Sequence, residues 1–376
     1  MDEEILYSIA LTRVLPYQSQ VQRQLTEAAG SVRALYEHRH QLRELLPSAS
    51  ERLQRTIAQW EQHMARAEQE MAFAEKNRIR VTIPSDVDYP ARLRECPDAP
   101  IVLYYRGTAD LNSRHMLSIV GTRRATEYGK TFCQRFLSDL SHLCPDVLIV
   151  SGLAYGIDIQ AHRQALQNGL PTIGILAHGL DQIYPRLHRQ TAIEMLQQGG
   201  LLTEFMSQST AEKINFVARN RIVAGMTDAT LVVESADKGG SLITAHIATD
   251  YNREVFAVPG RLGDAASAGC NGLIRDSQAI LLQSAEQLVE HIGWVTAQRE
   301  QQPVQRDLFP TLSDGTTASS PEEMAISRAL KGSDGKQLNQ LTVETNLPIG
   351  RLSSLLFDME MRGLVRRLSG GTYRWI

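Results

Sequence analysis

The sequence predicts an α/β fold built on an open, mainly parallel β-sheet, and two observations support this prediction. From about residue 100 to residue 297, short apolar runs alternate with longer segments of helical periodicity. Most of these runs are apolar at every position, which is typical of parallel strands that helices cover on both faces. Repeated alternation of strand and helix is the pattern of a doubly wound sheet.

Bulk composition narrows the class of protein. The 376 residues are enough for two or three domains, and 43% hydrophobic with 22% charged residues is ordinary globular composition. No apolar run reaches the roughly 18 residues that a membrane-spanning helix needs. The N-terminus lacks a signal pattern and the four cysteines lack metal-ligand spacing. We therefore expect a cytoplasmic protein without a metal site or a membrane span.

The net charge of −3 argues against a protein that coats nucleic acid by overall attraction. A negative net charge does not exclude a local basic groove. Salt screens charges beyond about 8–10 Å under physiological conditions, so a ligand responds mainly to the charges near it.

The chain divides into four parts. Residues 1–77 look wholly helical, and Ser48 or Ser50 is placed to cap a long helix from Glu51 to about Lys76. Residues 78–298 hold the predicted sheet. Residues 299–320 are polar and rich in Pro, Ser and Thr, which indicates a linker. Residues 321–376 predict three helices, at about 321–331, 337–344 and 348–362, and a short hairpin around residues 370–371.

The expected strands of the sheet follow from the apolar runs. They are Ile101–Tyr105, Leu117–Val120, Val147–Val150, Thr172–Leu176, Leu201–Thr203, Ala229–Val233, Glu254–Val258 and Ala279–Leu282.

Glycines collect where these strands end. Gly121, Gly152, Gly179 and the pair Gly239–Gly240 each follow a predicted strand. The carboxyl ends of strands in an open α/β sheet form the edge at which ligands bind. A single glycine there is explained by a tight turn, but four such turns beside basic or hydroxyl side chains favour a binding site.

Basic residues fall on loops of the same edge. Arginine suits phosphate because its planar fork donates two parallel hydrogen bonds. One arginine alone is more simply a solvated surface residue, whereas several on one edge indicate a groove for a phosphate chain. The residues in question are Arg123, Arg124, Arg186, Arg219, Arg221 and Lys238, the last just before a Gly-Gly-Ser helix start.

No catalytic set accompanies this groove. A Walker loop is absent because Arg124 stands where its first glycine is required, and neither a G-x-S-x-G elbow nor HExxH occurs. Asp158 is better explained as a helix-start carboxylate than as a general base. Glu204 and Glu234 end strands, where they either meet a ligand or form structural hydrogen bonds. We expect a binding protein with no catalytic residue and no cofactor.

Seven segments in order make a specific resemblance: SIVGTRRATEYG, IVSGLAYGIDIQAHRQAL, TIGILAHGLDQIYPRLHR, GLLTEF, NFVARNRIVAGMTDATLVVES, KGGSLITAHIA and REVFAVPGRLGDAASAGCNGLIRDSQAILL. Together they resemble the DNA-processing protein A family (DprA or Smf) from about Arg80 to Ile292. The resemblance implies an extended Rossmann-like domain that binds single-stranded DNA. It further implies a recombination mediator, not an enzyme, that protects incoming strands during natural transformation and loads the RecA recombinase.

The resemblance also assigns site residues. The family's strand-binding arginine in its G-[ST]-R turn corresponds to Arg123, and the basic residue of its Y-P-K segment corresponds to Arg186. Where the family often has P-R-R-N-R, residues 217–221 lack one basic residue. The candidate DNA-binding residues are Gly121, Thr122, Arg123, Arg124, Gly152, Arg186, Arg219, Asn220, Arg221, Lys238, Gly239, Gly240 and Ser241.

Base stacking is a further expectation, because selection for single strands requires contacts with exposed bases. The aromatic residues available for it, each of which is also explained as core, are Tyr128, Tyr155, Tyr184 and Phe216.

Partners follow from the resemblance as well. The family forms dimers through the late part of this domain, where CNGLIRDSQAILL lies, and uses an overlapping surface for RecA. Leu273, Ile274 and Leu281 in this stretch are also explained as core residues. A homodimer is therefore expected, without individual contacts.

Both flanking parts resemble modules of the family. The N-terminal helices are similar to a helix-hairpin-helix (SAM-like) module that often has a Gly-x-Gly hairpin, but the corresponding VLPYQS has no glycine, which argues for packing in place of duplex binding. The C-terminal part resembles a winged helix, with Arg351 on its third helix and Arg366 and Arg367 on its wing. Such a module binds either DNA or protein.

A separate hypothesis concerns Gln305–Phe309, QRDLF, which has the Q-x-x-L-F form of peptides that dock on the bacterial sliding clamp. A linker segment anchored on its own domain is the alternative.

The rival to a mediator is a nucleotide-handling protein of the same fold. Phosphoribohydrolases that resemble lysine decarboxylases carry P-G-G-x-G-T followed by a catalytic glutamate. Here PGRLGDA lacks the second Gly and the Thr, and KGGSLIT has no following carboxylate at the right distance. A nucleotide sensor would use the same pocket and stays open as an alternative.

Overall fold

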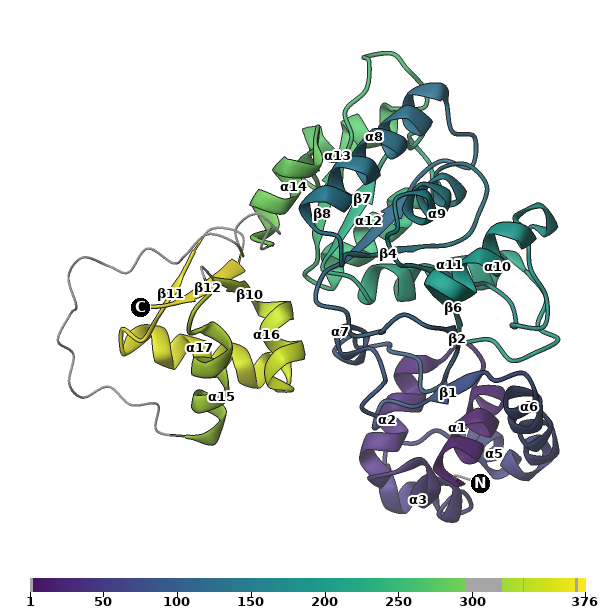
Figure 1. The fold of residues 1–376 in the computed structure, drawn as a ribbon. Coiled ribbons are helices and arrows are strands. Elements are labelled where there is room, and N and C mark those ends of the chain that lie inside the picture. The colour runs from purple at the N-terminus through teal and green to yellow at the C-terminus, as the bar shows by residue number, and fades with distance from the viewer. Residues whose placement is uncertain (1–2, 295–319, 334, 369–370) are drawn as a thin grey trace.

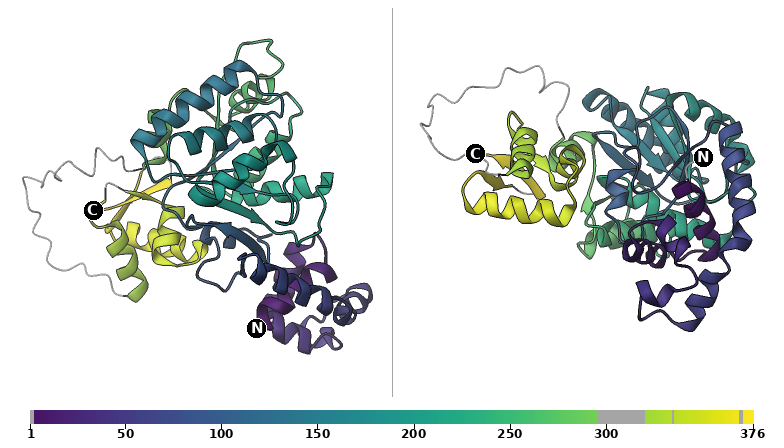
Figure 2. Two further views of the ribbon diagram at one scale, coloured as in Figure 1. Left: turned by 45° about the vertical axis from the view of Figure 1, so that its right-hand side comes forward. Right: turned by 90° about the horizontal axis from the view of Figure 1, so that it is seen from below.

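The computed structural model describes residues 3–294, 320–333, 335–368 and 371–376. A central α/β part lies between a helical N-terminal part and a small C-terminal part, which flank it on different sides (Figures 1 and 2). The prediction of an α/β fold with a mainly parallel open sheet, an N-terminal helical part and a C-terminal winged helix is confirmed.

Nine strands of the described chain form the central sheet, in the order β1-β2-β6-β5-β4-β3-β7-β8-β9. The pairs from β6 through to β9 are parallel, whereas β1 and β2 add on antiparallel at one edge. All eight expected strands are present with small shifts of their ends, and β1 was not predicted. Their bounds are β1 Arg80–Thr82, β2 Leu103–Gly107, β3 Met116–Val120, β4 Leu148–Ser151, β5 Thr172–Ile175, β6 Gly199–Thr203, β7 Ala229–Val232, β8 Glu254–Ala257 and β9 Ile280–Leu281.

Helices cover both faces of this sheet, which is why its strands are apolar throughout. One core cluster lies under α8, α9 and α14, and a second lies under α7, α11, α12 and α13. The helix α10 packs beside α9 on a smaller cluster. Their bounds are α7 Ala91–Arg94, α8 Glu127–Leu143, α9 Ile157–Gln167, α10 Arg189–Gln198, α11 Lys213–Gly225, α12 Gly240–Asp250, α13 Ala268–Arg275 and α14 Ala285–Ile292.

The chain runs outward from β3 to β6 on one side and returns to β7 on the other side of β3. The strand order therefore reverses between β3 and β7. At such a switch point the loops leave the sheet in opposite directions and open a crevice at the carboxyl edge.

The N-terminal part is helical, as expected, but its long helix is not continuous. Ser50 caps α5, and a 3₁₀ turn at Trp60–His63 separates α5 from α6. The turn buries the Trp60 ring edge-on against Tyr36. The sequence predicted a continuous helix here and did not predict this contact. The bounds are α1 Glu3–Val14, α2 Ser19–Ala29, α3 Val32–Glu37, α4 Leu42–Leu45, α5 Glu51–Ala58 and α6 Met64–Lys76.

In its described residues, the C-terminal part has three helices and a three-stranded sheet with its own apolar core. It contacts the central part at α7, where the backbone N–H of Ile349 donates to Glu95 Oε2 over 3.2 Å. The bounds are α15 Pro321–Leu330, β10 Lys336–Gln337, α16 Leu338–Thr345, α17 Ile349–Met361, β11 Val365–Arg367 and β12 Thr372–Trp375.

Two further expectations concern a membrane span and the candidate clamp-binding segment. Among the helices of the described residues, none is long and apolar enough to cross a membrane. The candidate clamp-binding segment Gln305–Phe309 lies outside the described residues.

Candidate functional site

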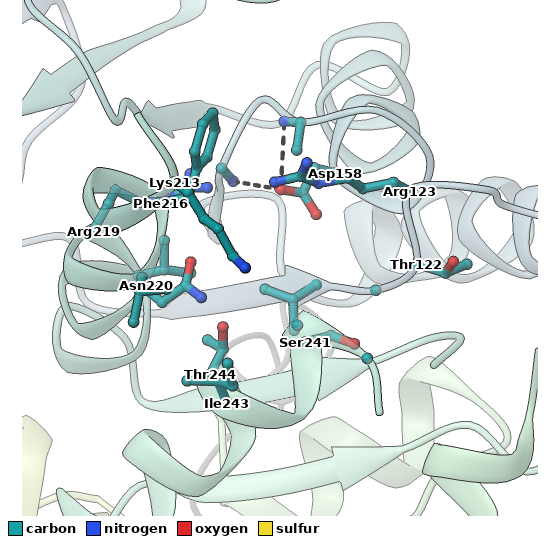
Figure 3. A pocket seen from close by; sticks show the side chains of 18 of the residues that line it. Thr122, Arg123, Asp158, Lys213, Phe216, Arg219, Asn220, Ser241, Ile243 and Thr244 are labelled. Carbon is teal, nitrogen blue, oxygen red and sulfur yellow. Dashed lines mark hydrogen bonds between the residues drawn. The ribbon is translucent and has the colours of Figure 1, made fainter. Parts of the chain in front are cut away.

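A pocket of about 600 Å³ opens at the switch point between β3 and β7. Its walls come from the loops after β3, β4 and β7, from the exposed side of α11, and from the first turns of α9 and α12 (Figure 3). Nine of the thirteen candidate residues line it: Gly121, Thr122, Arg123, Gly152, Arg219, Asn220, Gly239, Gly240 and Ser241.

Two of the glycines are required by close packing under the pocket floor. A Cβ on Gly152 would lie 1.9 Å from Nη1 of Arg219, and a Cβ on Gly121 would lie 2.5 Å from Cγ1 of Ile157. The absence of side chains at these strand ends lets Arg219 and α9 approach the sheet edge. Backbone at these two strand ends therefore forms part of the pocket floor, beside Arg219.

The accessible cations of the pocket are Arg123 and Lys213. The Arg123 guanidinium carbon lies 5.0 Å from the centre of the Phe216 ring, a cation–π contact. Lys213, in the first turn of α11, is exposed and its side chain points into the hollow (Figure 3). Sequence reasoning missed Lys213. Its position three residues before Phe216, on the same face of a helix, was the available signal.

Arg219 and Asp158 form a buried, mutually compensated pair of charges in the floor. Arg219 Nη1 donates to the carbonyl of Ile175 over 2.5 Å. Burial lowers the pKa of Arg219 to about 10, and the nearby Asp158 carboxylate partly offsets this effect. Arg219 thus lies at the bottom of the pocket with its charge partly compensated by Asp158.

Asp158 lies in the first turn of α9, where its Oδ2 accepts the N–H groups of Gly152 and Ala154 over 3.1 and 3.4 Å. Burial raises the pKa of this carboxyl, and Arg219 acts in the opposite direction. These bonds hold the loop after β4, in agreement with the interpretation of Asp158 as a helix-start carboxylate.

Arg221 lies apart from the pocket, on another side of α11. It is buried, it donates to Glu204 Oε2 over 2.5 Å, and its Nη1 donates to the carbonyl of Asp98 over 2.7 Å. Burial lowers the pKa of Arg221, but Glu204 and Asp98 together raise it above its usual value. The sequence predicted that Arg221 would lie in the groove. Instead its guanidinium is bonded to Glu204 and Asp98, which are distant from it in sequence.

The other three candidate basic residues are exposed but do not line the pocket. Arg124 follows Arg123 in the loop after β3, and Lys238 lies in the loop before α12. Arg186 begins a 3₁₀ turn after Tyr184, whose ring lies edge-on 6.0 Å from that of Phe216. The loop carrying Arg186 is therefore next to the aromatic wall of the pocket.

His178 fixes that loop. Its Nδ1–H donates to the carbonyl of Gly179 over 2.9 Å, and its Nε2 accepts the N–H of Tyr184 over 3.1 Å. Burial lowers the pKa of His178, which favours the neutral ring that this pair of bonds requires.

Of the four aromatic candidates, only Phe216 lines the pocket. Tyr155 packs edge-on against His188, and the Tyr128 hydroxyl donates to the carbonyl of Pro259 over 2.6 Å. Tyr128 belongs to a different hollow, beside Phe132 and Arg135.

The two strand-end glutamates have structural hydrogen bonds. Glu234 accepts the backbone N–H of Thr126 over 2.9 Å and also the Thr126 hydroxyl, which fixes the start of α8. Glu204 binds Arg221. Within the described ranges, no three His, Cys, Asp or Glu side chains gather where they could hold a metal ion.

Comparison with known proteins gives consistent matches over the same region. Residues 80–293 match the family model of DNA recombination-mediator protein A, and residues 310–371 match that of the DprA winged helix domain. Protein Smf of Synechocystis is 35% identical over 77% of this chain and 79% of its own length. DNA processing protein DprA of Bacillus subtilis is 39% identical over 56% of this chain and 71% of its own.

Two solved structures share both sequence and fold. The X-ray structure of DNA processing protein A from Streptococcus pneumoniae superposes with a TM-score of 0.60 at 30% identity, over 67% of this chain and 86% of its own. DNA processing protein A from Helicobacter pylori, described for its single-stranded DNA binding mode, gives 0.51 at 30% identity, over 56% and 94%. The chain thus belongs to the DprA/Smf family of DNA-processing proteins.

Proposed function

We propose that this chain binds single-stranded DNA in the pocket between β3 and β7, as a cytoplasmic recombination mediator. In this proposal it protects incoming DNA and loads the RecA recombinase during natural transformation. It binds the strand without a chemical reaction. The proposal is supported by family membership and by the H. pylori relative, whose structure concerns single-stranded DNA binding.

The observation that carries the proposal is the Arg123 guanidinium over Phe216, beside the glycines Gly121 and Gly152 at the strand ends. An arginine fork suits a phosphate, and an aromatic ring offers a stacking surface to any base. Lys213 adds a second exposed cation over the same hollow. In a duplex the bases are stacked on one another inside, so only a single strand brings phosphate and base here together.

The test is fluorescence anisotropy with labelled oligonucleotides, single-stranded and duplex, over a salt series. Arg123→Ala is expected to weaken single-strand binding by about tenfold or more, because it removes both the guanidinium that would bind phosphate and its packing on Phe216. Arg124→Ala is the matched control, with the same charge in the same loop but outside the pocket. Its effect is expected to be clearly smaller.

Salt dependence sharpens this test. Each ion pair with phosphate that a variant removes should reduce the slope of log affinity against log salt by about 0.7 for a single strand. Equal weak binding to single strand and duplex, unaffected by Arg123→Ala, would remove the proposed site. Turnover of mononucleotides by the pure protein would instead favour the rival nucleotide-handling function.

We further propose a homodimer that uses the β9 edge of the sheet. Of the three apolar residues considered there, Leu273 is buried in the core, Ile274 is partly buried, and Leu281 is 36% exposed on β9. β9 is an edge strand with one unpaired side among the described residues, which is a common place for a second chain to add. Leu281→Lys is expected to shift the protein towards monomer in sedimentation, and an unchanged mass would contradict this interface.

We also propose, from the sequence alone, that Gln305–Phe309 docks on the sliding clamp. A pull-down in which clamp is retained equally by wild type and by the double substitution Leu308→Ala/Phe309→Ala would remove it.

A further inference from the structure

The turn between α1 and α2 lies against α11, the helix that supplies Lys213, Phe216, Arg219 and Asn220 to the pocket. Tyr17 in this turn has φ of 58°, in the left-handed region. An aromatic residue rarely adopts this conformation, because its Cβ crowds the backbone. Such strain persists only where surrounding contacts hold it, and it is common at positions with a functional role.

The contact that holds Tyr17 is with α11. Its hydroxyl donates to Oδ1 of Asn215 over 2.8 Å, although 55% of the residue is exposed. Asn215 is buried, and its Nδ2 donates to the carbonyl of Thr210 over 2.9 Å. Both ends of the Asn215 amide are thus bonded, one to the loop before α11 and the other to Tyr17.

Asn215 lies between the two pocket residues of the first turn of α11, Lys213 and Phe216. Fixing Asn215 therefore fixes the backbone from which the cation and the stacking ring project. An unpaired helix start has free N–H groups and frays readily. Glu212, the residue before α11, makes no side-chain capping bond to the helix.

The same turn contacts α11 at a second point. Ser19, the first residue of α2, accepts from Nη2 of Arg221 over 3.0 Å. Behind it, Glu70 of α6 accepts the backbone N–H of Ser207 over 2.7 Å, and Arg66 donates to the Ser207 carbonyl over 2.7 Å. The N-terminal part thus holds both α11 and the loop that leads into it.

We propose that Tyr17 is a positioning residue for the strand-binding pocket, and that the N-terminal part acts on DNA through α11 and not by touching DNA itself. This inference rests on the function proposed above. Arg221 serves the same purpose from the other side, because its partners are Ser19, Glu204 and Asp98.

The experiment compares Tyr17→Phe with wild type in single-strand binding and dissociation. Phe keeps the ring and the turn and removes only the hydroxyl. Affinity is expected to fall by about threefold to tenfold, the effect of removing one hydrogen bond, mainly through faster dissociation. Tyr36→Phe is the matched control, because the Tyr36 hydroxyl bonds to Glu61 within the N-terminal part. It should leave affinity unchanged.

A double-mutant cycle separates positioning from general stability. If Tyr17 acts through the first turn of α11, its effect on affinity should be smaller in a Lys213→Ala background than in wild type. Tyr17→Gly is a second variant, since glycine adopts positive φ without strain. It should keep the turn and still weaken binding.

The outcomes distinguish this inference from the function on which it rests. Wild-type affinity in Tyr17→Phe, with weakened binding in Arg123→Ala and Lys213→Ala, would overturn the inference alone. Equal losses of affinity in Tyr17→Phe and Tyr36→Phe, or full additivity with Lys213→Ala, would also overturn it. Unchanged binding in Arg123→Ala and Lys213→Ala would remove the proposed function first.

Discussion

Arg219 and Arg221 are two positions apart on α11, but their side chains lie on different sides of the helix and bind different partners. Residues two apart on an α-helix point about 200° from each other. Arg219 therefore reaches the pocket floor beside Asp158, whereas Arg221 reaches Glu204 and the N-terminal part. A basic pair in sequence is thus divided between the pocket and an interdomain contact.

Burial decides how each charge near the pocket behaves. Asp158 and Arg219 compensate each other in the floor, so neither brings a strong free charge to a ligand. Arg123 and Lys213 are exposed, so their side chains are accessible to a phosphate group. We infer that the exposed pair provides most of the salt-sensitive attraction, and that the buried pair shapes the site.

His162 gives a prediction about pH. Its ring is fully buried, its Nδ1 lies 2.7 Å from the Thr172 hydroxyl oxygen, and its Nε2 has no hydrogen-bond partner among the described residues. Burial lowers the pKa of His162 to about 3. The folded protein therefore stays unprotonated at this ring below pH 6.5, while the unfolded chain takes up a proton. The stability that the neutral ring contributes is present above the unfolded pKa and is lost as pH falls below it.

The measurement is urea unfolding at a series of pH values from about 7.5 to about 5. His162→Gln should flatten the pH dependence of the unfolding free energy below pH 6.5 by up to about 1.4 kcal/mol per pH unit. His142→Gln, at an exposed position on α8, is the control for the loss of a histidine. Equal slopes in wild type and His162→Gln would contradict the interpretation of His162 as a buried neutral ring.

At the scale of elements, the pocket is made by the ends of β3, β4 and β7 and by the start of α12. Gly240 and Ser241 begin α12 and line the hollow, and the N-terminus of a helix attracts anions. The glycines at the end of β4 and at the start of α12 differ in the space around them. Gly152 makes room for Arg219, whereas a Cβ on Gly240 would meet open space.

This difference predicts that the same substitution affects stability at one position and not at the other. Gly240→Ala should keep stability within about 1 kcal/mol, since alanine favours a helix over glycine, and should weaken single-strand binding by narrowing the pocket. Gly152→Ala should lower both, because its Cβ would displace the buried Arg219. Thermal unfolding and anisotropy on the same samples provide the check. Full binding by Gly240→Ala would show that the strand does not approach α12.

At the scale of the whole molecule, a buried ion pair joins the segment between β1 and β2 to the core. Arg92 of α7 donates through Nε to Asp228 Oδ1 over 2.7 Å and through Nη2 to Oδ2 over 3.1 Å. It also donates to the carbonyls of Ser113 and Arg114, each over 2.9 Å. Both charged side chains lie in the interior and neither lines the pocket.

Asp228→Asn is expected to cost about 3–5 kcal/mol of unfolding free energy, because it leaves the buried Arg92 charge without its partner. Asp88→Asn removes the partner of Arg80 at the surface and should cost little. Chemical denaturation of both variants is the measurement. A decrease for Asp228→Asn no larger than that for Asp88→Asn would show that the buried pair does not tie α7 to the core.

The sheet and the three C-terminal helices could be predicted from the sequence because fully apolar runs and helical periodicity are local signals, whereas the winged helix was implied by the family resemblance. The break at Trp60 could not, since it depends on how Trp60 packs on Tyr36 from another helix. The same holds for the site. Loops after strands converge by topology, so Arg123 and Gly152 were predictable, whereas the partners of Arg221 depend on contacts across the chain.

The central claim is that a single strand lies in the pocket between β3 and β7. The most direct measurement is photo-crosslinking of a single-stranded oligonucleotide that carries 5-iodouracil, followed by mass-spectrometric identification of the attached residue. We expect crosslinks to Phe216 in the pocket and to Tyr184, whose ring packs edge-on against it, and these crosslinks should disappear in Arg123→Ala. Crosslinks confined to residues 320–376 or to the N-terminal helices, and unchanged in Arg123→Ala, would contradict the account.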